Sequence, residues 1–170
     1  MKKMGYMLLV IMVVVIGYGI IEEMLYSPLK KEDMKTLFPD STISYNFAYN
    51  KDYIGWSKGN IFDIYIYKLE NVFINLDYPK FGKKWEHISL PDTVITSKWI
   101  KCPIDSVILS NYNFELLKIC DSGLEGENLK RSLQDTNNYY CYIYVSALEK
   151  YFLLYNVSEK KLYYIRQRGF

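Results

Sequence analysis

An apolar stretch near the N-terminus, residues 4–21, limits what the chain can be more than any other feature. It reads MGYMLLVIMVVVIGYGII and holds no charged residue between Lys3 and Glu22. As a helix it would be ~27 Å long, which matches the hydrocarbon thickness of a bilayer. A helix in a soluble core would show a polar side at every turn, whereas this stretch is apolar all round. It therefore predicts a transmembrane helix.

The sequence around this stretch predicts an uncleaved signal anchor. The residues at its end, GIIEEM, contain no small-residue cleavage site, and no cysteine follows at which a lipid could be attached. Lys2 and Lys3 in front are typical of a signal anchor, although Lys30, Lys31 and Lys35 beyond it nearly balance them. We expect the C-terminal part to be periplasmic or extracellular.

This layout divides the chain of 170 residues into a short cytoplasmic head, a transmembrane signal anchor, a juxtamembrane connector and a single β-rich extracytoplasmic domain. Their bounds are residues 1–3, 4–21, 22–42 and 43–170, in that order. The connector has Ser27 as a possible N-cap, Pro28 at a first helical position and Pro39 as a stop. These signals predict a short helix over residues 27–38.

The rest of the chain alternates apolar and polar residues over short runs separated by turn residues, which is typical of strands. Strands or shorter extended pieces are predicted over residues 43–49, 53–56, 61–68, 72–76, 85–90, 93–97, 104–109, 114–120, 139–147, 151–157 and 162–166. One short helix is predicted over residues 128–134, capped by Asn128. Because strands follow strands without long helices between them, we predict an α+β fold, mainly an antiparallel β-sheet of meander and hairpins with short peripheral helices, preceded by one transmembrane helix.

The charge balance argues against nucleic acid as a partner. The chain has 21 basic and 19 acidic residues; without Lys2 and Lys3, 19 of each remain and the net charge is zero. A neutral domain has no long-range field that attracts phosphates. The basic residues near the C-terminus are interpreted as the solvated face of a strand, because they alternate with apolar ones. These residues are Lys160, Lys161, Arg166 and Arg168.

Motifs for metal, cofactor or nucleophile chemistry are missing from the sequence, so no cofactor and no metal is expected. His87 is the one histidine, and we interpret it as a residue at a strand edge or a loop end. The loop at residues 121–128 has an acid first and a glycine sixth, as a calcium loop does. It has Gly123 third and Ser132 twelfth, where oxygen ligands are needed, so we interpret it as a solvated turn.

Three cysteines, Cys102, Cys120 and Cys141, are too far apart in the sequence to form a C-x-x-C pair. Cys120 and Cys141 fall in predicted strands, where a free cysteine behaves as a small buried apolar residue. In an oxidising compartment one disulfide would also be compatible with the spacing. The sequence leaves both alternatives open.

The aromatic residues are the candidate binding residues, because Tyr and Trp combine large contact area with a polar tip. Tyr140, Tyr142 and Tyr144 share one face of a predicted strand, and in a two-layer domain one such stripe would be exposed. The weak candidate binding face combines these three with the tryptophans Trp56, Trp85 and Trp99. A core role for the aromatic residues is the alternative. The glycosylation sequon at Asn156 falls inside a predicted strand.

We therefore expect a non-enzymatic, membrane-anchored domain that binds a protein or a polymer through an aromatic face. A periplasmic inhibitor or immunity-type protein would be one form of it. The alternatives are a small envelope polysaccharide hydrolase with a carboxylate pair, or a structural subunit of an envelope complex. The carboxylates available for such a pair are Asp63, Asp77, Glu86, Asp92 and Asp105.

Overall fold

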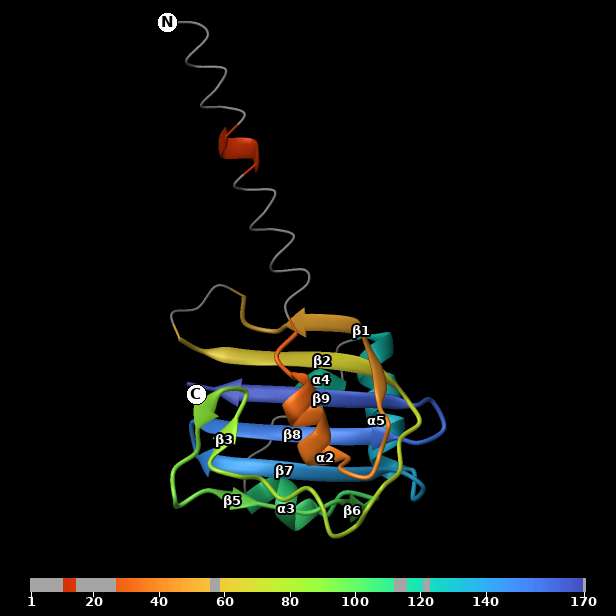
Figure 1. Cartoon of the computed structure of the whole chain (residues 1–170). Helices are drawn as coiled ribbons and strands as arrows, with labels where there is room; N and C mark the ends of the chain where they lie inside the picture. The colour runs from red at the N-terminus through yellow and green to blue at the C-terminus, as the bar shows by residue number, and fades with distance from the viewer. Residues whose placement is uncertain (1–10, 15–26, 56–58, 112–115, 121–122, 170) are drawn as a thin grey trace, which may run out of the picture.

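A seven-stranded antiparallel sheet forms the centre of the computed structural model of the chain (Figure 1). The structure describes residues 11–14, 27–55, 59–111, 116–120 and 123–169. The strands lie in the order β1-β2-β9-β8-β7-β5, and β6 also pairs with β7. They are β1 (Ser44–Asp52), β2 (Ile61–Glu70), β5 (Ile95–Thr96), β6 (Ile100–Lys101), β7 (Tyr139–Ser146), β8 (Glu149–Asn156) and β9 (Lys161–Arg168). The predicted fold class, α+β with a mainly antiparallel sheet and a few short helices, is confirmed.

Both faces of the sheet are covered, so the domain has three layers (Figure 1). The α2 face is covered by helix α2 (Lys31–Leu37) and the hairpin of β3 (Lys84–Trp85) and β4 (Ile88–Ser89). The opposite α5 face is covered by α3 (Ser106–Asn111), α4 (Leu116–Cys120) and α5 (Leu124–Gln134). Since side chains on both faces contact a covering layer, β8 and β9 are buried along nearly their whole length.

Two segments predicted as strands are helices. Residues 104–109 and 114–120 contribute to α3 and α4, and α4 buries Leu116, Ile119 and Cys120 against the α5 face of the sheet. Apolar runs this short fit either a strand or one buried turn of helix, and their periodicity does not separate the two. The strand prediction was therefore wrong here because packing on the sheet decided the conformation.

Gly126 allows α4 and α5 to approach each other closely. A Cβ atom at this position would lie 2.2 Å from the carbonyl oxygen of Ile119, so any other residue would collide with the backbone of α4. Helix α5 begins at Leu124, earlier than predicted. The predicted cap, Asn128, lies inside the helix, where its backbone oxygen accepts the hydroxyl of Ser132 at 2.8 Å.

Other boundaries also differ from the prediction. Residues 72–76 form a loop and not a strand, and 53–55 form a bend after β1. Helix α2 begins at Lys31, later than predicted, and the side chain of Asp33 accepts the N–H of Lys30 at 2.8 Å. Ser27 does not cap it; its hydroxyl lies 3.1 Å from that of Tyr67 on β2. Part of the predicted connector thus packs on the sheet.

The C-terminal meander was predicted correctly. Strands β7, β8 and β9 are consecutive antiparallel neighbours, and β9 also pairs along its length with β2. This second pairing was not predicted. It places β9 in the middle of the sheet and brings residues about a hundred positions apart in the sequence opposite each other.

The predicted transmembrane anchor lies almost entirely outside the described residues. Of residues 4–21, the structure describes 11–14, which are helical and exposed. Among the residues described, no helix has the length and apolar character needed to cross a membrane.

Candidate functional site

Most of the predicted aromatic face is buried in the described part of the chain. Tyr140 and Tyr142 are only 1% and 8% exposed and lie beneath α4 and α5, and Tyr144 is half-buried beside them. Trp85 and Trp99 are 1% and 3% exposed in the core of the α2 face. The expected exposure was wrong for these residues, because the domain has three layers instead of two.

The buried tryptophans also have internal partners for their polar tips. Trp85 donates its Nε1–H to the hydroxyl of Tyr164 at 2.7 Å, and Trp99 donates to the carbonyl oxygen of Leu37 at 3.0 Å. The ring of Trp99 stacks on Phe38. These contacts fasten α2 and the β3–β4 hairpin to the sheet. Trp56 lies outside the described residues.

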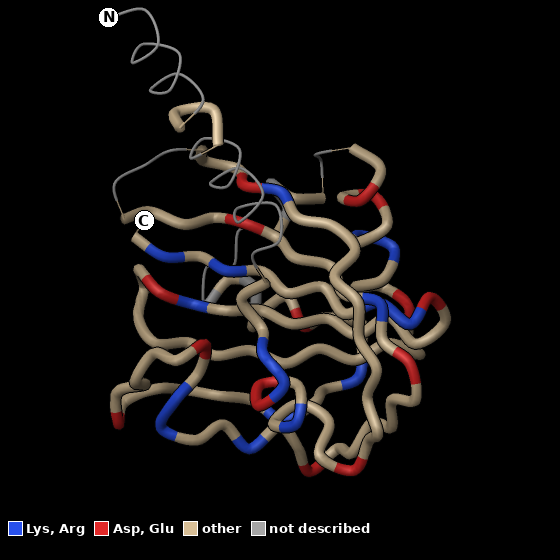
Figure 2. The backbone as a smooth tube through the Cα atoms, turned by 45° about the horizontal axis from the view of Figure 1, so that its top comes forward, with Lys and Arg blue, Asp and Glu red and all other residues tan. Residues whose placement is uncertain are grey.

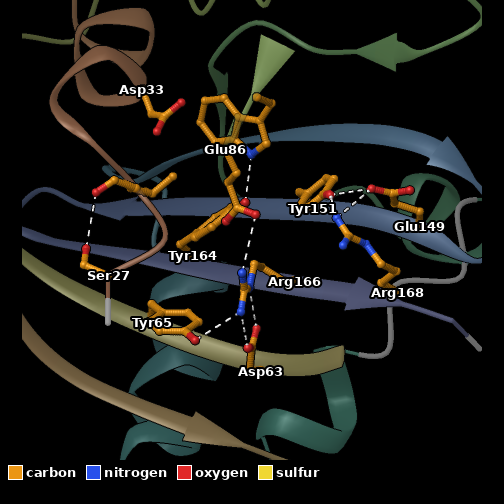
Figure 3. A network of polar contacts seen from close by, with 12 residues as sticks. Ser27, Asp33, Asp63, Tyr65, Glu86, Glu149, Tyr151, Tyr164, Arg166 and Arg168 are labelled. Atoms are coloured by element: carbon orange, nitrogen blue, oxygen red, sulfur yellow. Dashed lines mark hydrogen bonds and ion pairs between the residues drawn. The ribbon is translucent and has the colours of Figure 1, made fainter. Parts of the chain in front are cut away.

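A buried charged cluster lies under the β3–β4 hairpin, at the end of β9 (Figure 3). Arg166 on β9 lies directly opposite Asp63 on β2 and donates two hydrogen bonds to its carboxylate, at 2.9 and 2.6 Å. The same guanidinium donates to the hydroxyl of Tyr65 at 3.1 Å and approaches Glu86 at 3.4 Å. The cluster therefore holds two carboxylates around one arginine.

Glu86 reaches this cluster from a strained turn. Glu86 and His87 link β3 to β4 with φ angles of 48° and 66°, the left-handed conformation of a two-residue hairpin turn that usually takes Asn-Gly. Each such non-glycine residue costs of order 1 kcal/mol. His87 is exposed at the turn, as its interpretation as a loop-end residue predicts. The strain is compensated by the contact between Glu86 and Arg166.

The environment of Glu86 raises the pKa of its carboxyl group. Burial raises the pKa of this carboxyl above its ordinary value, and the opposing effects of Arg166 and the Tyr164 hydroxyl are smaller. Oε2 faces the guanidinium, whereas Oε1 is buried without a hydrogen bond of good geometry to a described residue.

The cluster does not provide the cleft that a glycosidase needs. The side chains of Asp63 and Glu86 are 9% and 5% exposed, and both contact Arg166. Neither carboxylate lies on a surface that a sugar could reach, although Trp85 is adjacent in the chain. The remaining acids of the predicted inventory are apart: Asp77 pairs with Lys98, Asp92 with Lys83, and Asp105 accepts the N–H of Val107.

Arg166 is a residue of the cluster that was not predicted from the sequence. It was placed with Lys160, Lys161 and Arg168 on a solvated strand face, but Arg166 is 8% exposed, so that interpretation was wrong for it. Arg168 is nearer the surface and pairs with Glu149 at 3.0 Å. The available signal was an arginine that directly follows an apolar run, in LYYIR, and an aspartate inside another, IFDIYIY. Ionised residues inside or directly after such runs predict a buried pair.

The cysteines and the sequon lie in the interior. Cys102, Cys120 and Cys141 are free and buried, and burial raises the pKa of the Cys102 thiol to about 12, which disfavours a reactive thiolate. Cys120 lies in a helix and not in the predicted strand. Asn156 is buried and donates to the Ser132 hydroxyl at 2.7 Å. Within the described ranges, no group of three or more potential metal ligands comes together.

The two edges of the sheet differ. The outer edge of β7 is covered by β5 and β6, and between them Ser97 exchanges hydrogen bonds with Tyr142 at 3.0 and 2.9 Å. At the opposite edge, β1 pairs with β2 alone among the strands that the structure describes. Such an edge presents backbone donors and acceptors to any extended chain beside it.

The hydrogen bonds of β2 show which of its backbone groups point toward β1. Leu69 donates to the carbonyl of Lys160 on the β9 side, and Phe62 accepts from Tyr53 on the β1 side, both at 2.8 Å. Backbone direction alternates along a strand. The even-numbered residues of β2 therefore point toward β1.

This alternation identifies the outward groups of β1. Asn46 and Tyr49 lie opposite even-numbered residues of β2 and bond to it, with a bulge between Phe47 and Tyr49. Tyr45, Phe47 and Asn50 then direct their N–H and C=O groups away from the sheet. The bulge also turns the half-buried rings of Tyr45 and Phe47 to the α2 face and that of Tyr49 to the α5 face.

A pocket of about 310 Å³ lies where α2 meets the start of β1. It is lined by Lys31, Met34, Lys35, Ser41, Thr42, Ile43 and Tyr45. Lys31 and Lys35 are one helical turn apart, so they lie on one side of α2, and both are exposed. Neither forms a salt bridge with a described residue, and no carboxylate lines the pocket. Basic and acidic residues are otherwise interspersed along the chain (Figure 2).

Comparison with known proteins identifies no family: no family model matches the chain, and neither a curated protein nor a solved structure does.

Proposed function

We propose that this chain is a membrane-anchored binding protein, without enzymatic activity, that recognises an extended segment of a protein partner by adding it to β1. The observation that supports this most is the open edge of β1, whose outward groups belong to Tyr45, Phe47 and Asn50. Main-chain hydrogen bonds to such an edge give affinity, and side-chain contacts at alternate positions give specificity.

The half-buried rings on β1 support the same proposal. Tyr45 and Phe47 pack only partly against the α2 face, so each leaves ring surface at the edge. An added strand brings its side chains to within about 5 Å of theirs, which is the reach of cross-strand pairs. The binding surface proposed from the sequence is thus replaced by the aromatic residues of the edge strand.

The anchor remains part of the proposal. The apolar stretch 4–21 is long enough to cross a bilayer, and its described part, Ile11 to Val14, is helical with 49–63% of each side chain exposed. Exposed apolar residues on a helix suit a lipid environment. The signal-anchor layout supports a position of the binding domain outside the cytoplasm, where a protein inhibitor would meet its target.

Hydrogen exchange on the full chain in lipid nanodiscs tests the proposal. Peptides selected from a random display library would be added, and the outward amides of Tyr45, Phe47 and Asn50 should become protected. The amide of Tyr49 faces β2 and should be protected with or without peptide, which makes it the internal control. Selected peptides that protect another surface, or a selection that yields none, would contradict strand addition.

A pair of variants at one position isolates the backbone contribution. Asn50→Pro removes an outward N–H, a change that edge strands tolerate. It should weaken peptide binding at least tenfold, because a bound strand loses a main-chain hydrogen bond and meets the proline ring. Asn50→Ala keeps the N–H and should bind normally. Equal affinities for the two variants would contradict pairing at this position.

A further inference from the structure

The edge pocket has the charge and the position to select one side chain of the added strand. It is formed by the exposed side of α2 and by Ile43 and Tyr45, which are two residues apart and so share one face of the edge strand. A side chain that lies opposite Tyr45 on the α2 face of an added strand points toward this pocket. The pocket is thus continuous with the surface proposed for partner binding.

Its chemistry is that of a carboxylate site. Lys31 and Lys35 supply two ammonium groups, and Thr42 and Tyr45 supply hydroxyl groups. Burial, with smaller effects from Glu32 and Asp33, raises the pKa of the Tyr45 phenol, so this group keeps its proton and can donate. These ammonium and hydroxyl groups can donate hydrogen bonds to the oxygens of an anionic group, and the ammonium groups also balance its charge.

The nearby acids do not line the pocket. Asp33 is buried and accepts the N–H of Lys30, and Asp40 accepts from the side chain of Asn75 at 2.8 Å. Glu32 is adjacent to Lys31 in α2 but does not line the pocket. The lining therefore has two positive charges and no negative one.

The volume of the pocket and the apolar part of its lining restrict which ligand can bind. A volume of about 310 Å³ is at the lower end of the range for ligand sites, so it suits a single side chain and its water better than a folded surface. Met34, which is 1% exposed, and Ile43 form an apolar part of the lining. A short carbon chain that ends in a carboxylate fits both features.

We propose that the partner segment is acidic at one position, and that a Glu or Asp side chain of the strand added to β1 enters the pocket of Lys31 and Lys35. This inference rests on the proposed strand addition, and it names the chemistry of the partner. It accounts for the two exposed lysines on one side of a short helix whose Met34 and Leu37 are buried in the core.

A charge reversal in the pocket tests it. Peptides would be selected by display against the full chain in nanodiscs, and in parallel against the double variant Lys31→Glu, Lys35→Glu. The natural chain should enrich Glu or Asp at one fixed position, and the double variant should enrich Lys or Arg there. For one selected peptide, Glu→Gln at that position should weaken binding to the natural chain about tenfold, and Lys101→Glu at the other edge of the sheet should change nothing.

The failures of the two proposals are distinguishable. Peptides that protect the β1 amides but show no acidic position, or the same position with both chains, would overturn the pocket assignment and leave strand addition intact. If peptides protect another surface or none bind, strand addition fails and the pocket assignment fails with it. Circular dichroism on the double variant checks that it folds, and Lys31→Gln with Lys35→Gln gives the same test without adding charge.

Discussion

Two groups of charged residues in this domain, the Arg166 cluster and the edge pocket, differ in how their charges are satisfied. In the cluster, Arg166 binds Asp63 and Glu86 beneath the β3–β4 hairpin, and every group is at most about a tenth exposed. In the pocket, Lys31 and Lys35 are exposed and form no salt bridge with a described residue. Charges that bind each other hold layers together, whereas charges that line a cavity without partners are available to a ligand.

The substitution Arg166→Met should cost the most stability. It leaves Asp63 and Glu86 buried without their cation, and removal of one partner from a buried pair costs about 3–5 kcal/mol. We expect that loss in the free energy of unfolding, measured by urea denaturation. Arg168→Met is the matched control, because its pair with Glu149 is about a third exposed and such pairs contribute up to about 1 kcal/mol. Equal losses for the two variants would mean that Arg166 is not structural.

Tyr65→Phe separates the hydroxyl from the ring within the cluster. The ring lies 4.9 Å from the Arg166 guanidinium and is kept, while the hydrogen bond from Arg166 is lost. A hydrogen bond to a charged group contributes about 1.5–3 kcal/mol, so we expect a loss near the lower end. Tyr45→Phe at the pocket should change stability by less than about 0.5 kcal/mol, because that ring is only half-buried. A loss at Tyr45 as large as that at Tyr65 would contradict the distinction.

The pH dependence of stability should report Glu86. Its pKa is raised in the folded state above an ordinary value of about 4.5, so the folded chain binds more protons than the unfolded chain between these two values. The stabilising contribution of the protonated carboxyl is therefore complete below about 4.5 and is lost as the pH rises through the folded-state pKa. Compared with Glu86→Gln, the natural chain should gain stability as the pH falls through the folded-state pKa of Glu86 toward 4.5.

A matched variant on the surface corrects for the loss of a carboxyl group in general. Glu70→Gln removes an exposed carboxyl on β2 outside the cluster. Urea denaturation at several pH values gives the difference between the natural chain and each variant. A difference for Glu86→Gln that does not change with pH would show that the carboxyl titrates alike in both states.

The sequence predicted local pairing well and long-range pairing poorly. The meander of β7, β8 and β9 follows from alternation and short links, and it was predicted. The pairing of β2 with β9 brings Asp63 opposite Arg166, although the two residues are far apart in the sequence. No local sequence pattern predicts this pairing. Without that pairing, β9 seemed to have a solvated face, so the Arg166 cluster was missed. The burial of Tyr140 was missed because the helices α4 and α5 cover its face of the sheet. The edge pocket depends on where α2 crosses the sheet, which the sequence of α2 does not specify.

The least change in stability is expected when the two lysines of the pocket are replaced. Lys31→Ala with Lys35→Ala removes two exposed charges from a helix, and alanine favours helix at least as well as lysine. The change in the free energy of unfolding should stay within about 0.5 kcal/mol, since substitutions of this kind on a surface usually do. A small stabilisation would agree with this prediction as well as a small loss would, because the two lysines lie one helical turn apart and repel each other. A loss of several kcal/mol would show that these lysines hold the fold together as Arg166 does, and the pocket would then be a structural site and not a place for a ligand.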